Sequence, residues 1–197
     1  MSKSSFSIIG AGAIGTAIAR LLAGAGIDVK IANSRGPASL AGLAEELGPH
    51  VQPSSVEQAA SADIVFLAVP WSRIPAAIAG LGDWAGRIVV DANNAIEVPG
   101  FKAVDLGGRA SSAVVAGMLP GARVVKAFNH LQAALLTPAK NGQRVLFYSG
   151  EHEDAKREVA RLIERLGFFG IDLGGTETGK LAQFPGGPLP TLDLLKQ

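Results

Sequence analysis

The feature that most constrains the fold is a strand, a turn, a helix and a second strand packed into residues 5–35. A short apolar run ending at Ile9 predicts the first strand. Residues 14–22 then repeat apolar side chains at the i, i+3, i+4 spacing of an amphipathic helix. Residues 27–31 alternate apolar and charged side chains, which predicts the second strand. Together they predict a βαβ unit, the building block of a parallel sheet covered by helices.

Three glycines with the spacing GxGxxG occupy the turn of this unit: Gly10, Gly12 and Gly15. In this context the first allows a tight turn, the second lets the backbone approach a pyrophosphate, and the third lets the helix close on the strand. The free N–H groups at the helix start then face the phosphates. A glycine turn alone is weak evidence, because such turns are common. Between a strand and a helix of this length, it predicts dinucleotide binding.

The residues that follow the second strand indicate which dinucleotide is bound. A site specific for NAD usually carries an acidic residue about 20 residues beyond the glycines. This chain has Asn33, Ser34 and Arg35 there instead. A guanidinium suits a 2′-phosphate by charge and by its two-pronged geometry, so NADP(H) is the predicted cofactor. The alternative is that Arg35 is an ordinary solvated loop residue.

The rest of the chain continues the alternation of strands and helices. Further strands are predicted near Val51 and at residues 64–69, 88–90, 123–128, 145–148 and 169–173, and helices at residues 37–48, 55–60, 72–81, 111–119 and 153–166. We expect Ser72 to cap one helix and Ser111 or Ser112 another. Residues 95–108 contain Pro99, Gly100, Gly107 and Gly108, show no helical pattern and are predicted to be a loop.

This pattern predicts an α/β fold with a doubly wound, mainly parallel sheet of the Rossmann type and a short Pro/Gly-rich C-terminal extension. We assign residues 1–175 to the NADP-binding domain. Residues 176–197 form the extension, which is not expected to be an independent domain.

Composition excludes several classes of function. A net charge of +1 without a long basic run argues against nucleic-acid binding, and no run of about 20 apolar residues predicts a membrane span. The chain has no cysteine, which removes disulfides and thiol chemistry, and no metal site is expected. Hydrophobic residues reach 48%, so a subunit interface is plausible and a homodimer is expected. The expected location is the cytoplasm.

Four motifs together resemble a known family. They are the GxGxxG turn, Asn-Ser-Arg at 33–35, Ala-Val-Pro-Trp at 68–71 and Val-Val-Lys-Ala-Phe-Asn at 124–129. The chain resembles the NADP oxidoreductases that depend on the deazaflavin coenzyme F-420, whose fold is shared by the cytosolic domain of the six-transmembrane metalloreductases. The likeness covers nearly the whole chain.

The resemblance implies a set of cofactor-binding residues. Those expected around the pyrophosphate are Gly10, Ala11, Gly12, Ala13, Ile14 and Gly15; those at the adenosine end are Asn33, Ser34, Arg35, Ala68, Val69 and Pro70; those near the nicotinamide and a second stacked ring are Asn93, Asn94, Ala127, Phe128 and Asn129. The residues at 91–94 and 128–130 are nearer the ferric-reductase version than the deazaflavin one. The acceptor, coenzyme F-420 or a flavin, therefore stays open.

Three functions remain compatible with the sequence. The first is hydride transfer between NADP(H) and a small-molecule ring acceptor, which needs positioning and no obligatory acid or base. The second is reduction of a small imine or carbonyl compound, which needs a proton donor; His130 is the weak candidate, since the only tyrosine, Tyr148, forms no Tyr-x-x-x-Lys pair. The third is a non-catalytic NADP(H)-binding sensor. Lys126, inside a strand sequence, is expected to pack its stem and extend its amine to solvent.

Overall fold

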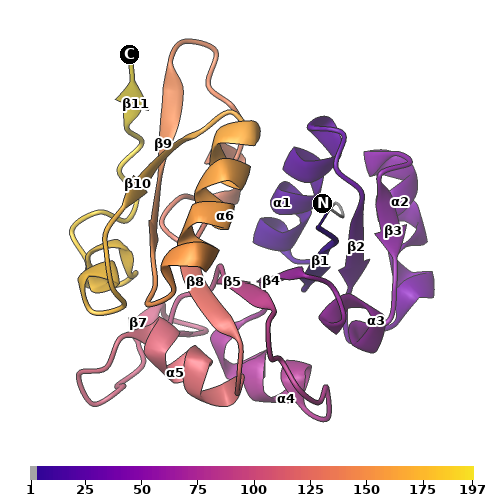
Figure 1. Cartoon of the computed structure of the whole chain (residues 1–197), viewed down its shortest axis with the longest axis horizontal. Coiled ribbons are helices and arrows are strands. Elements are labelled where there is room, and N and C mark those ends of the chain that lie inside the picture. Colours follow the sequence, from indigo (N-terminus) through magenta and orange to yellow (C-terminus); the bar gives the residue numbers. More distant parts are fainter. Residues whose placement is uncertain (1–3) are drawn as a thin grey trace.

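A central sheet organises residues 4–197, the part of the chain that this computed structural model describes (Figure 1). Its strands in spatial order are β10 (Phe169–Asp172), β9 (Gln143–Ser149), β8 (Arg123–Ala127), β5 (Ile88–Asp91), β4 (Ile64–Leu67), β1 (Phe6–Ile9), β2 (Val29–Ala32) and β3 (Val51–Pro53). The run from β3 to β8 is parallel and has the strand order of dinucleotide-binding folds. The predicted doubly wound, mainly parallel fold is confirmed.

The edge of the sheet formed by β9 and β10 departs from the parallel pattern. β9 runs antiparallel to β8, and β10 runs parallel to β9. A further short strand, β11 (Leu195–Lys196), pairs antiparallel with the start of β9. This last strand was not predicted, because two residues in a Pro/Gly-rich tail carry no period.

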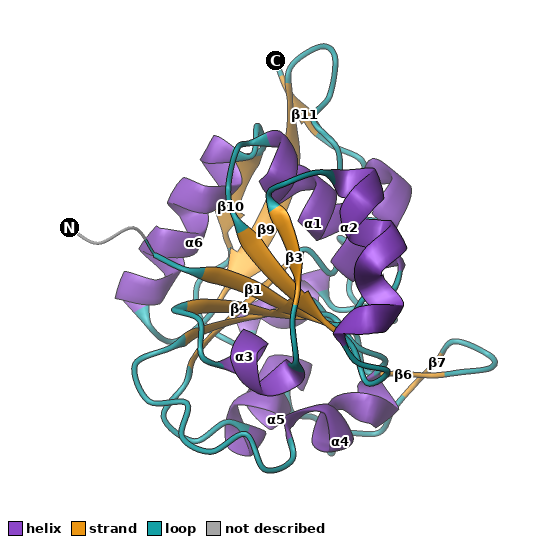
Figure 2. Cartoon of the chain, turned by 90° about the vertical axis from the view of Figure 1, so that its right-hand side faces the viewer, coloured by secondary structure: helices purple, strands orange, loops and turns teal. Residues whose placement is uncertain are grey.

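Helices cover both faces of the sheet because buried strands direct alternate side chains to opposite faces. On β4, Ile64 and Phe66 join one core cluster, and Val65 and Leu67 join the other. The helices of the first layer are α1 (Ala13–Gly24), α2 (Ala41–Leu47) and α6 (Glu153–Arg165); those of the second are α3 (Val56–Ala60), α4 (Ile74–Ile78) and α5 (Ser111–Met118) (Figure 2). The sheet is therefore buried on both sides, as its near-continuous apolar strands require.

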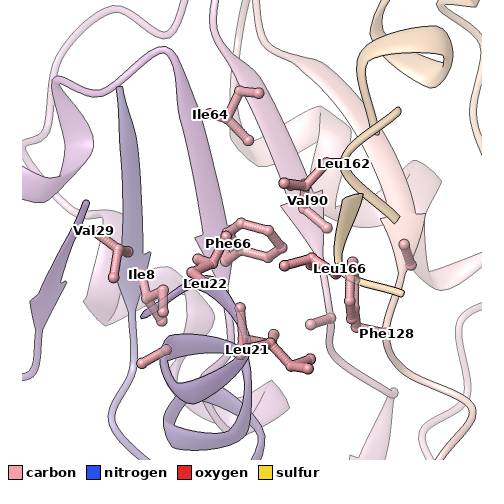
Figure 3. Close-up of a cluster of buried hydrophobic side chains, with 14 of the residues drawn as sticks. Ile8, Leu21, Leu22, Val29, Ile64, Phe66, Val90, Phe128, Leu162 and Leu166 are labelled. Atoms are coloured by element: carbon pink, nitrogen blue, oxygen red, sulfur yellow. The ribbon is translucent and has the colours of Figure 1, made fainter. Parts of the chain in front are cut away.

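The first core cluster joins the two halves of the molecule. Phe66 of β4 and Phe128, just after β8, meet edge to face with ring centroids 5.6 Å apart. Figure 3 shows Leu22 of α1 and Leu166, just after α6, converging on the same region. These contacts hold the first βαβ unit to the later strands.

Four local predictions differ from the structure. Residues 37–40 form a separate 3-10 turn, η1 (Pro37–Leu40), before α2. Ser72 lies inside another 3-10 turn, η2 (Trp71–Arg73), and makes no cap hydrogen bond. Ala110 occupies the N-cap of α5, so neither serine caps that helix. The expected loop at residues 95–108 carries a small hairpin of β6 (Ile96–Glu97) and β7 (Lys102–Ala103).

The C-terminal extension lies against β9. It contains the 3-10 turn η4 (Thr178–Ala182), and Ala182 and Leu189 pack with Val145 and Phe147 of β9 in a small separate cluster. Because the extension adds a strand to the sheet and has little core of its own, we propose that residues 176–197 fold together with residues 1–175.

Candidate functional site

The glycine turn between β1 and α1 is built by close backbone contacts. Gly10 has φ +117°, and a Cβ there would lie 2.1 Å from the carbonyl oxygen of Ala68. A Cβ on Gly15 would lie 1.9 Å from the carbonyl oxygen of Gly10. A Cβ on Gly12, in contrast, would meet nothing within 4 Å. Two glycines thus close the turn on the protein itself, and the third leaves space on its outer side.

The start of α1 beside Gly12 suits an anion. Gly12 is the N-cap and offers no side chain, so no side-chain cap satisfies the first N–H groups, and the first turn contains no acidic residue. Gly12 and Ala13 are exposed. Uncapped N–H groups and the positive end of the helix dipole favour a phosphate at this place. The open side of Gly12 is where such a group fits.

At the end of β2, Asn33 fixes the backbone of the loop, and the side chains of Ser34 and Arg35 stay exposed. Its Oδ1 accepts from the Arg35 N–H at 2.9 Å, and its Nδ2 donates to Ser39 Oγ at 3.0 Å. Ser34 and Arg35 are exposed, and within residues 4–197 Arg35 forms no ion pair with a carboxylate. The exposed guanidinium of Arg35 is therefore available to bind an anionic group.

Two cavities lie over the carboxyl ends of the strands and share Gly12, Ala68, Val69 and Pro70. Together they form one groove, whose halves we name by the cofactor ends that the sequence predicts there: the adenosine half and the ring half. The adenosine half, about 670 Å³, reaches Asn33, Ser34 and Arg35. The ring half, about 870 Å³, reaches the β6–β7 hairpin. The groove therefore crosses the point where the strand order reverses, between β1 and β4, as ligand sites do in this kind of fold.

The ring half has walls that are mostly apolar. Its side chains are those of Ala13, Ile14, Ala68, Val69, Pro70, Trp71, Ser72, Ala92, Asn93, Asn94, Ile96, Glu97, Val98, Pro99, Val104, Asn129 and Leu131. Glu97 is the only ionisable group among these lining residues, and it is exposed. The ring half thus offers mostly apolar side chains, and its polar groups include three carboxamides, the Ser72 hydroxyl and the Glu97 carboxylate.

Asn93 stabilises the backbone at the base of the groove through its side-chain hydrogen bonds. Its Oδ1 accepts from the Val69 N–H at 3.0 Å, and its Nδ2 donates to Leu67 O and to Asp91 Oδ1 at 3.0 and 2.9 Å. The side chain therefore ties the end of β4 to the end of β5.

Asn94 and Asn129 connect the groove to the C-terminal extension. Asn94 donates to Asn129 O at 2.7 Å, and its Oδ1 accepts from Asn129 Nδ2 and from the Phe184 N–H, each at 3.1 Å. Asn129 Nδ2 also donates to Ala182 O at 2.7 Å. Both asparagines line the ring half, and both hold the extension in place.

Three expected cofactor-binding residues line neither half of the groove: Gly15, which is buried where α1 packs on the turn, Ala127 and Phe128. Ala127 and Phe128 are fully buried in the first core cluster, and the Phe128 ring packs on Phe66 (Figure 3). The backbone of Phe128 has φ +64°, a conformation that L residues rarely adopt. Phe128 therefore turns the chain after β8 and directs its ring into the core. The family resemblance, in contrast, implied a position beside a ligand.

The structure does not place His130 where a proton donor is needed. Its ring is buried, lies 4.9 Å from the Phe147 ring and lines neither half of the groove. Burial lowers its pKa to about 4, and the backbone of Val145 opposes this only in part. His130 is therefore neutral near pH 7, a poor state for a general acid.

Lys126 corrects another expectation. Its amine does not reach solvent: Nζ lies 3.0 Å from Asp91 Oδ2 and 3.1 Å from Ser111 Oγ, and the residue is buried. Lys126 and Asp91 are register partners on adjacent strands, so their side chains meet inside the protein.

Sequence reasoning missed several lining residues. Ile96, Val98 and Val104 flank the ring half from the β6–β7 hairpin region, and Arg73 and Glu57 line the adenosine half. The Pro and Gly signals that predicted a loop at residues 95–108 marked this wall without showing that it turns back on the groove. Within the described residues, no three His, Asp or Glu side chains are grouped to hold a metal ion.

Comparison with known proteins places these features in context. Residues 5–95 match the family described as NADP oxidoreductase coenzyme F420-dependent. Over 194 residues the chain is 30% identical to metalloreductase STEAP3 of Rattus norvegicus; this covers 94% of the chain but only 38% of that protein. No helix among residues 4–197 is long and apolar enough to cross a membrane.

Solved structures extend the match over most of the chain. The hypothetical protein SMa0349 from Sinorhizobium meliloti is 50% identical with a TM-score of 0.95, covering 99% of this chain and 97% of that one. An F420-dependent NADP-reductase from Arthrobacter sp. FB24 is 29% identical with a TM-score of 0.79, covering 90% and 88%. An imine reductase from Pseudomonas sp., 19% identical with a TM-score of 0.68, covers 93% and 59% and shares the fold alone.

Proposed function

We propose that this NADP-dependent oxidoreductase transfers a hydride between NADP(H) and a deazaflavin or flavin acceptor, because residues 5–95 match the family described as NADP oxidoreductase coenzyme F420-dependent. The observation that carries the acceptor class is the lining of the ring half. It holds apolar side chains and asparagines, with one exposed carboxylate. Transfer between two rings needs them held face to face, and the lining supplies that without a proton relay.

The residues of the groove fit NADP(H). The uncapped start of α1 at Gly12 would receive the pyrophosphate, and Ser34 with Arg35 would hold the 2′-phosphate. Val69 and Pro70, which border both halves, would form the wall between the two ends of the cofactor. A bound nicotinamide would supply the hydride chemistry, and the residues of the groove would orient the two rings.

The two other functions make different demands on the groove. An imine or carbonyl reductase needs a group that delivers a proton to the substrate, and His130 is buried away from the groove. Glu97 lines the ring half, so it is the residue such a reductase would depend on. A sensor would bind NADPH and transfer nothing.

Turnover with a panel of acceptors tests the proposal. NADPH oxidation is followed with coenzyme F-420, FMN, FAD, ferric chelates, and a set of small imines and ketones; the ferric chelates are included because one relative is named a metalloreductase. We expect turnover with one or more ring acceptors and little effect of Glu97→Gln. Turnover of an imine or ketone alone, abolished by Glu97→Gln, would contradict the proposal. Tight NADPH binding without any turnover would favour the sensor.

We also propose a homodimer located in the cytoplasm. Val98 and Phe101 at the tip of the β6–β7 hairpin expose 69% and 63% of their surface, and Leu192, Leu194 and Leu195 of the extension are also exposed. Apolar groups of this size gathered on protruding segments are typical of interfaces. Mass in solution, with and without residues 185–197, tests the dimer and the part of the extension in it. Fractionation of cells that express the tagged chain tests the location.

A further inference from the structure

The molecule contains a buried ion pair directly beneath the groove. Lys126 Nζ of β8 lies 3.0 Å from Asp91 Oδ2 of β5, and the two side chains are 4% and 0% exposed. Removing two charges from water costs as much as their attraction returns, and a well-packed apolar pair is often at least as stable. General stability is therefore a weak explanation for charges at this position, and a specific structural task is a stronger one.

The pair has one shared partner, Asn93. Asp91 Oδ1 accepts from the Asn93 N–H at 3.1 Å and from its Nδ2 at 2.9 Å. Lys126 Nζ donates to the Asn93 backbone oxygen. Asn93 is thus held from its backbone N–H, its backbone carbonyl and its side chain by the two charged residues.

Asn93 in turn holds the wall of the groove. Its carboxamide oxygen accepts a hydrogen bond from the Val69 N–H, and its amide nitrogen donates one to Leu67 O at the end of β4. Val69 borders both halves of the groove, whereas Asp91 and Lys126 line neither. Hydrogen bonds therefore form one continuous chain from Lys126 and Asp91 through Asn93 to the wall at Val69.

We propose that Asp91 is a positioning residue that sets the ring end of the groove through Asn93, and that Lys126 neutralises the buried Asp91 carboxylate. The inference rests on the proposed function, since it takes this groove as the NADP(H) site. Both donor positions of the Asn93 amide are occupied, so Asn93 acts on the cofactor through the backbone it holds. The register pairing of β5 with β8 makes this possible, because it sets Asp91 opposite Lys126.

Two neutral double variants test the proposal. Asp91→Asn with Lys126→Met removes both charges but leaves a carboxamide oxygen to receive the Asn93 N–H. Asp91→Leu with Lys126→Met removes the charges and the acceptor together. Neither leaves a buried charge without a partner. Affinities for NADPH and for 2′,5′-ADP, which lacks the nicotinamide end, are measured beside thermal stability and acceptor turnover.

The positioning role predicts a difference between the two variants. A wall displaced by a fraction of an ångström should weaken NADPH binding in the Leu variant about tenfold and lower kcat by about tenfold or more, with 2′,5′-ADP affinity changed less than about threefold. The Asn variant should stay within about threefold of wild type in all of these quantities. Lys156→Met is the matched control. It removes another buried lysine, paired with Glu153 and Asp172 away from the groove, and should alter stability without changing the affinity ratio.

The outcomes separate this inference from the proposed function. A wild-type chain that does not bind NADPH overturns the function first. A wild type that binds, with folded Asn and Leu variants of equal affinity ratio and kcat, overturns the positioning role alone. If the Leu variant does not fold, Asn93→Ala in the wild-type background decides. It leaves the ion pair in place and should lose NADPH affinity relative to 2′,5′-ADP; an unchanged ratio rejects the proposal.

Discussion

Gly12 and Gly15 belong to one motif but have opposite surroundings. A side chain at Gly12 would enter the groove without touching the protein, whereas one at Gly15 would collide with the backbone of Gly10. We expect Gly12→Val to keep most of the stability and to abolish NADPH binding. Gly15→Ala should lower the melting temperature strongly, because backbone has to move. Thermal unfolding and NADPH titration of both variants check this; equal loss of stability would contradict the assignment.

We propose that Arg35 sets the preference for NADP(H) over NAD(H). Charge-assisted contacts contribute about 1.5 to 3 kcal/mol, so Arg35→Ala should weaken NADPH binding by about tenfold or more while leaving NADH nearly unchanged. Arg73 lines the same half of the groove and provides the comparison, since Arg73→Ala shows how much any nearby cation contributes. Isothermal titration with both cofactors measures the effect. Wild-type protein that binds NADPH and NADH equally would count against the prediction.

His130 gives the fold a pH dependence. Its pKa in the folded protein is about 4, against 6.5 for the free side chain, because burial disfavours the charged ring. Stability is therefore full above pH 6.5 and falls as the pH drops from 6.5 to 4, where the unfolded chain takes up the proton first. The loss is at most about 3 kcal/mol. His130→Phe should flatten this part of the curve in denaturant titrations, whereas a change at the exposed His152 should not.

At the scale of elements, the C-terminal strand depends on one largely buried arginine. Arg144 of β9 donates to Asp193 through Nε at 2.5 Å and through a second nitrogen at 3.2 Å, and also binds the carbonyls of Leu135 and Thr137. This places the chain just before β11 against β9. The extension is thus held by side-chain contacts and by backbone pairing with β9, a segment distant in the sequence, which explains why its own sequence predicted only turns.

Breaking that contact should loosen the extension. Asp193→Ala leaves a charged guanidinium with fewer partners and should cost about 1 to 3 kcal/mol. The exposed pair Arg20–Glu46 is the matched control, because Glu46→Ala should cost about 1 kcal/mol or less. Chemical denaturation measures both. An Asp193 variant as stable as the Glu46 variant would show that Arg144 does not hold the extension.

At the scale of the whole molecule, the groove is assembled from segments that lie far apart in the sequence. The ends of β1, β2, β4 and β5 contribute Gly12, Arg35, Val69 and Asn93, and the β6–β7 hairpin adds one wall. Strand order brings these ends together, because the chain winds outward in both directions from β1 and β4. The whole site therefore depends on topology more than on any single motif.

Local chemistry in the sequence was enough to predict the fold class and many of the residues that line the adenosine half of the groove. Glycine spacing, the apolar period of α1 and the absence of an acidic residue at positions 33–35 involve only a few neighbouring residues, so they can be seen without the fold. The roles of Phe128, His130 and Lys126 were decided by tertiary structure. Each follows or lies within a strand whose alternation shows that a side chain is buried but not what it meets. The partner comes from another strand, as Asp91 does for Lys126, and that pairing exists only once the sheet has formed.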